Sequence, residues 1–141
     1  MNQLTSDKAN QIIVAALAYS KTEGYPPMGV AVVDAAGQIK AFVREDGATA
    51  LRFDIAMGKA VAAAGMSCSS RELPELQSKI PVFFATLASS TPQHFIPQTG
   101  AVLIKDSDGT ILGAVGASGG TGDQDEAICM AGVVATGYTH A

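Results

Sequence analysis

An apolar strand leads through a glycine-rich turn into an acidic helix start in residues 113–126, GAVGASGGTGDQDE. Glycine adopts backbone conformations with positive φ and lets another group approach the main chain without a side-chain clash. Gly119 and Gly120 therefore mark either a tight reversal of the chain or a place where a ligand rests on bare backbone. Both interpretations stay open, and both glycines are candidate ligand-binding residues.

The helix after this turn begins with closely spaced acidic side chains. Asp123 and Glu126 have the spacing of a capping box, in which the first side chain accepts from an N–H of the first turn and the second reaches back. Carboxylates at this position would repel an incoming phosphate, and the chain has no G-x-x-x-x-G-K-[ST] motif. We therefore expect a helix cap here and no phosphate site.

The spacing of apolar residues elsewhere predicts two hairpins and several helices. Period-two alternation on both sides of a turn predicts hairpins over residues 28–44 and 101–117. Helical spacing predicts helices over residues 6–22, 49–64 and 123–138, and a weaker helical segment over 71–87 that is interrupted at Pro81. This order predicts an α+β fold, an antiparallel sheet of two hairpins, with four to five strands, flanked by helices.

The composition limits the kind of protein and its partners. A chain of 141 residues, 48% hydrophobic and 16% charged, is long enough for one domain with a core, so we expect a single domain over 1–141. A net charge of -4 without a run of Lys or Arg disfavours nucleic acid and membrane surfaces as partners. The start of the chain lacks the pattern of a signal peptide, which predicts a cytoplasmic protein. Low charge with many small apolar residues favours a homo-oligomer.

Four segments carry a resemblance to a known family. They are GVAVVDAAG (29–37), FVREDGA (42–48), GKAVAAA (58–64) and the segment 113–126. In these segments and their order the chain resembles the haem-degrading domain family, which includes GlcG-like proteins, secreted haem-binding proteins and the C-terminal domain of PduO-type corrinoid adenosyltransferases. The resemblance implies a PAS- or profilin-like α+β sandwich. It also implies a tetrapyrrole ligand, with haem ahead of a corrinoid, and haem degradation as a further activity.

Histidines are the first residues to consider as ligands of haem iron, which takes His, Cys, Met or Tyr as axial ligand. The helix predicted over 6–22 contains none. His140 is the penultimate residue, where we expect a frayed and solvated tail. His94 lies in a loop stiffened by two prolines, beside Phe95, so His94 is the candidate axial ligand and Phe95 a candidate pocket wall. The other candidate donors are Tyr25, Met28, Cys68 and Cys129.

A second group of candidates is charged. Arg44 and Asp46 share a face at a strand end, and the helix that follows could bring Lys59 near them. These three residues form either a structural ion pair or, as the resemblance implies, a pocket edge or subunit contact. As candidate catalytic residues, Arg44 and Lys59 would polarise a carbonyl while Asp46 or Asp54 acts as acid or base. His94 from its loop would support this chemistry.

Three functional hypotheses follow. The first is a binding protein for haem or a related tetrapyrrole. The second is a small enzyme or accessory protein of a catabolic operon that acts on a small metabolite. The third is an oligomeric scaffold without chemistry of its own.

Overall fold

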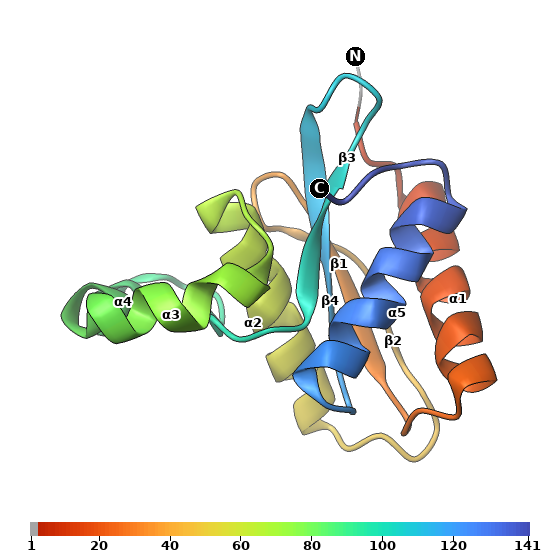
Figure 1. The fold of residues 1–141 in the computed structure, drawn as a ribbon, viewed down its shortest axis with the longest axis horizontal. Helices are drawn as coiled ribbons and strands as arrows, with labels where there is room; N and C mark the ends of the chain where they lie inside the picture. Colours follow the sequence, from red (N-terminus) through yellow and green to blue (C-terminus); the bar gives the residue numbers. More distant parts are fainter. Residues whose placement is uncertain (1–2) are drawn as a thin grey trace.

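The structure is a computed structural model that describes residues 3–141 (Figure 1). The elements are, in chain order, α1 (Ser6–Glu23), β1 (Gly29–Asp34), β2 (Ile39–Arg44), α2 (Leu51–Met66), the short 3-10 helix η1 (Ser70–Glu72), α3 (Leu73–Lys79), α4 (Pro81–Ser90), β3 (Ala101–Lys105), β4 (Ile111–Ser118) and α5 (Gly122–Ala135).

The strands form one antiparallel sheet in the order β2-β1-β4-β3. Each predicted hairpin therefore supplies one central and one outer strand. The two central strands, β1 and β4, pair with each other in a register that places Val32 opposite Val115. The α+β fold with a four-stranded antiparallel sheet confirms the expectation from the sequence.

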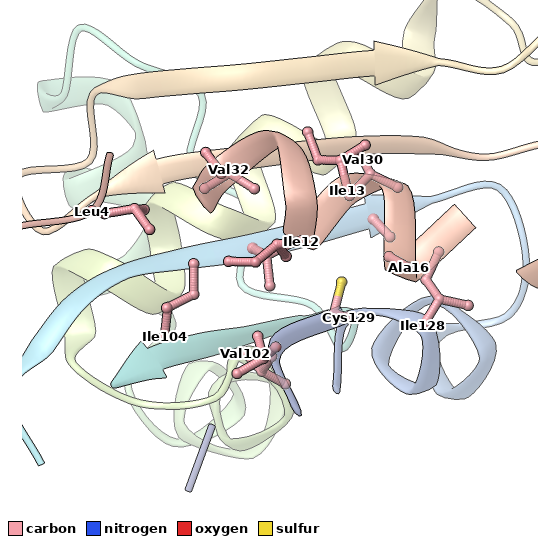
Figure 2. Packing of buried hydrophobic residues seen from close by; sticks show 14 of the residues in the cluster. Leu4, Ile12, Ile13, Ala16, Val30, Val32, Val102, Ile104, Ile128 and Cys129 are labelled. Carbon is pink, nitrogen blue, oxygen red and sulfur yellow. The ribbon is translucent and has the colours of Figure 1, made fainter. Parts of the chain in front are cut away.

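Helices cover both faces of the sheet (Figure 1). Because side chains alternate along a strand, Val30 and Val32 of β1 point to one face while Ala31 and Val33 point to the other. Figure 2 shows the first face, where Ile12 and other side chains of α1 and α5 pack on the valines. The result is a layer of two helices, the sheet, and α2 on the opposite face.

Small residues let α2 lie close to its face of the sheet. A Cβ atom at Gly116 of β4 would stand 2.5 Å from the carbonyl oxygen of Ala56 and 2.9 Å from the amide nitrogen of Ala60. Any side chain at Gly116 would therefore push the helix away. This close contact fixes the position of α2 and with it the direction of its side chains.

Helices α3 and α4 extend to one side of the molecule (Figure 1), and we call this segment, Leu73–Ser90, the arm. Leu73 and Phe84 anchor it because both are buried in a small cluster with Ala62 of α2. The break between its helices falls at Ile80, and Pro81 begins α4. The predicted interruption at Pro81 is confirmed.

The cap of α5 differs from the prediction. Thr121 Oγ1 accepts from the Gln124 amide at 3.1 Å, and Gln124 Oε1 accepts from the Thr121 amide at 3.1 Å. The predicted box of Asp123 and Glu126 is therefore wrong, because residues two positions earlier cap the helix. The carboxylates of α5 are free to interact elsewhere.

The last helix is also shorter than predicted, since α5 ends at Ala135 and Gly137 has a positive φ of 89°. Within residues 3–141 no helix combines the length and apolar character that a membrane crossing needs.

Candidate functional site

A buried ion pair joins α2 to the start of α5. Lys59 Nζ lies 2.9 Å from Asp125 Oδ2 and donates to the carbonyl oxygen of Ala117 at 3.0 Å. The other carboxylate oxygen of Asp125 accepts from the Gly120 amide at 2.9 Å. Because an unpaired buried charge is costly, each of these two side chains depends on the other. The pair holds α2, the end of β4 and the glycine turn together.

A second cluster of charges joins α5 to η1. Arg71 Nε donates to both carboxylate oxygens of Glu126, at 2.9 and 3.0 Å, and the guanidinium also pairs with Asp123. The hydroxyl of Ser69 donates to Glu126 at 3.3 Å. These hydrogen bonds, that of Glu126 first, raise the pKa of Arg71 above its ordinary value. Arg71 is therefore a fixed cation beside a buried carboxylate.

The charged cluster around Arg71 and Glu126 borders a cavity of about 480 Å³ at the outer strand β3. Arg71 lines it from η1, Val102 and Lys105 from β3, and Met130 from α5. No ion pair found within residues 3–141 includes the ammonium group of Lys105, so this cation is available to a ligand.

The C-terminal segment closes one side of this cavity. The Lys105 amide donates to the Thr139 carbonyl at 2.8 Å, and the Thr139 amide donates to the Lys105 carbonyl at 3.0 Å. This bridge holds the adjacent His140 in the cavity lining, where the residue is half-buried. The expected frayed tail is wrong, because main-chain pairing to β3 orders the segment.

The cavity holds three kinds of donor to haem iron. They are the imidazole of His140, the thioether of Met130 and the thiol of Cys68. Burial, followed by the nearby charge of Glu72, raises the pKa of Cys68, so the thiol form prevails at neutral pH. A protonated thiol is a poor metal ligand, which leaves the imidazole and the thioether as the better donors.

Comparison with known proteins places the chain in a family with a haem connection. Residues 4–134 match the model of a protein family that is described as haem-degrading and HbpS-like. The chain belongs to the HbpS-like family. No curated protein sequence matches it.

Three solved structures are similar to this HbpS-like chain. A double mutant of HbpS from Streptomyces reticuli is 27% identical, with a TM-score of 0.83 over 96% of this chain and 88% of that one. The PduOC:heme complex is 25% identical, with a TM-score of 0.84 over 99% of this chain and 100% of that one. Protein ORFY of Klebsiella pneumoniae is 25% identical, with a TM-score of 0.80 over 96% of this chain and 92% of that one. These similarities agree with the observed fold.

The three charged residues predicted as a group have separate partners in this HbpS-like chain. Arg44 is exposed and donates to the carbonyl oxygen of Ala48 at 2.7 Å. Asp46 is exposed and lines a hollow of about 220 Å³ beside Tyr25. Lys59 is buried with Asp125. Among the described residues no ion pair joins Arg44, Asp46 and Lys59, so the structure does not assemble the predicted pair.

His94 and Phe95 lie in the loop between α4 and β3. His94 Nε2 is 2.9 Å from Asp54 Oδ1, and the His94 side chain is 57% exposed. Phe95 is half-buried, with its ring centroid 6.1 Å from that of Phe84. His94 therefore faces Asp54 and solvent, whereas Phe95 packs toward the arm.

The glycine turn is packed against the same chain. Gly119 has a positive φ of 155°, and a Cβ atom there would overlap the carbonyl oxygen of Pro27. A Cβ atom at Gly120 would overlap the side-chain oxygen of Gln124 and lie 3.1 Å from the methyl carbon of Met28. Gly119 thus permits a close approach to the segment before β1, and Gly120 permits one to the first turn of α5.

Proposed function

We propose that this chain binds haem in the cavity at β3, with the imidazole of His140 as ligand to the iron. The observation that carries the proposal is a single cavity that combines His140, the cation Lys105 and the apolar side chain of Met130. Its volume of about 480 Å³ lies within the usual range for small-molecule sites, about 300–1,000 Å³. Membership of the HbpS-like family and the likeness to the PduOC:heme complex support the same ligand.

Each group in the cavity has a defined task in this proposal. Met130 would contact the apolar porphyrin, Lys105 would pair with a propionate, and His140 would donate a nitrogen lone pair to the iron. Arg71 is held by Glu126 and Asp123, so it contributes a fixed positive charge at the rim and does not swing toward a ligand. Bound haem would supply a redox-active iron at this position.

The two histidines of the chain provide a matched test by haemin titration followed at the Soret band. We expect saturable one-to-one binding by the wild type. His140→Ala should weaken binding about tenfold or more and change the Soret position, because an axial ligand is lost. His94→Ala should bind like the wild type, because that imidazole is exposed and faces Asp54.

Other outcomes assign the ligand differently. Loss of the Soret shift in His94→Ala alone would make His94 the axial ligand, as the sequence predicted. Displacement of haemin by equimolar cobalamin would favour a corrinoid. No Soret shift up to about 50 μM haemin, which corresponds to binding weaker than about -6 kcal/mol, would reject haem as the ligand.

A further inference from the structure

A second hollow, of about 380 Å³, lies between α2, α4 and the turn that joins β1 to β2. We call it the arm crevice. Val61 and Met66 line it from α2, Phe83 and Leu87 from α4, and Phe95 from the following loop. None of the described residues that line it is charged. The arm crevice thus differs in chemistry from the cavity at β3.

Two polar side chains at the rim of the arm crevice form hydrogen bonds within the chain. Gln93 Nε2 donates to the carbonyl oxygen of Gly37 at 3.0 Å, which ties the loop to the β1–β2 turn. The hydroxyl of Thr91 donates to the carbonyl oxygen of Gln93 at 2.9 Å. The arm crevice therefore offers apolar contacts to a ligand and no counter-ion to a charged one.

Gly65 is a second feature of the crevice wall. The other glycine of α2, Gly58, is required by packing, because a Cβ atom there would lie 2.7 Å from Ile96 Cγ1. A Cβ atom at Gly65 would meet no heavy atom within 4 Å, and the left-handed residue at the end of the helix is Ser67, with φ of 56°. Neither packing nor backbone conformation requires glycine at position 65, although glycine destabilises a helix. Gly65 is exposed and lines the crevice, so the α2 wall leaves room for an occupant at this residue.

We propose that the arm crevice is a binding site for an uncharged apolar small molecule with an aromatic or alkyl body. The molecule packs against Phe83, which is 50% exposed without it, and lies over Gly65. Haem is a poor occupant, because the lining offers only the Met66 thioether to the iron and no cation to the propionates. The site is therefore independent of the cavity at β3.

The test is a fluorescence titration with N-phenyl-1-naphthylamine, an uncharged probe that brightens in apolar surroundings. We expect saturable binding by the wild type. Gly65→Leu should bind about tenfold more weakly or not at all, because the new side chain fills the crevice. Gly65→Leu should still fold, since no atom of the chain stands in the way. Ala18→Leu, at an exposed position of α1, is the matched control and should bind like the wild type.

Three results would overturn the proposal. The first is probe binding that is absent in the wild type or unchanged in Gly65→Leu. The second is a drop in molecular mass of Gly65→Leu by light scattering, which would make the crevice a contact between copies of the chain. The third is loss of the haemin Soret shift in Gly65→Leu, which would show that the two sites are not independent. A normal Soret shift with lost probe binding is the result we expect.

Discussion

Two ion pairs formed by neighbouring residues of α5 differ sharply in burial. Lys59 and Asp125 have side chains that are 7% and 3% exposed, whereas those of Arg71 and Asp123 are 51% and 81% exposed. Two positions along a helix thus separate a pair in the protein interior from one in solvent. Sequence proximity alone says little about the energetic weight of a charge, and the pairs should respond differently to substitution.

The buried pair of Lys59 and Asp125, the inner pair, should show the largest effect on stability. Lys59→Met should lower the free energy of unfolding by about 3–5 kcal/mol, because Asp125 keeps a buried charge without a counter-ion. Urea denaturation measures the loss. The double variant Lys59→Met/Asp125→Asn should recover much of it, since the amide oxygen can still accept from Gly120. A loss below about 1 kcal/mol in the single variant would contradict the account.

An intermediate effect is expected at Glu126, which is 5% exposed and shares Arg71 with Asp123. Glu126→Gln should destabilise by about 1–3 kcal/mol, because the charge-assisted hydrogen bonds from Arg71 are weakened. Glu72→Gln, at an exposed position, is the control and should change stability by about 0.5 kcal/mol or less. Equal losses in the two variants would show that the burial of Glu126 carries no weight.

The exposed pair of Arg71 and Asp123, the outer pair, should contribute least to stability. Asp123→Asn should cost about 0–1 kcal/mol, because solvent screens the interaction with Arg71. Urea denaturation at low salt and at about 1 M salt should show the difference from the wild type shrinking with salt. A salt-independent loss above about 2 kcal/mol would place this pair with the inner one.

The two free thiols show the same contrast in burial, since Cys129 is buried and Cys68 is half-buried. Here the contrast affects reactivity. Burial raises the pKa of Cys129, with Asp125 adding to the effect, and burial also raises that of the half-buried Cys68. Because the thiolate is the reactive form, both should react with iodoacetamide more slowly than free cysteine at neutral pH, and faster as the pH rises. Mass spectrometry should find Cys68 modified first and Cys129 only after unfolding. Modification of Cys129 in the folded protein would contradict its burial.

Local patterns predicted most of the fold. Alternation identified both hairpins, and Pro81 marked the break in the arm because proline lacks the N–H that a helix interior needs. The cap of α5 was assigned wrongly because Asp123–Glu126 and Thr121–Gln124 have the same spacing. Spacing alone did not distinguish them.

The site was harder to predict because its contacts are long-range. Lys59 and Asp125 are 66 positions apart, and no local pattern pairs them. His140 was expected in a frayed tail, and only the pairing of Thr139 with the distant Lys105 places it at the cavity. Gly137 is the local feature of the sequence that belongs to this arrangement, because its positive φ of 89° lets the chain turn toward β3.

Haem ligation by His140 is tested most directly by adding imidazole to the His140→Ala variant during a haemin titration. If His140 is the axial ligand, the variant alone should lack the wild-type Soret band, and free imidazole should restore it by occupying the vacated position. His94→Ala, titrated in parallel, should show the wild-type band without imidazole. A wild-type band in His140→Ala before imidazole is added would contradict the assignment of the iron ligand.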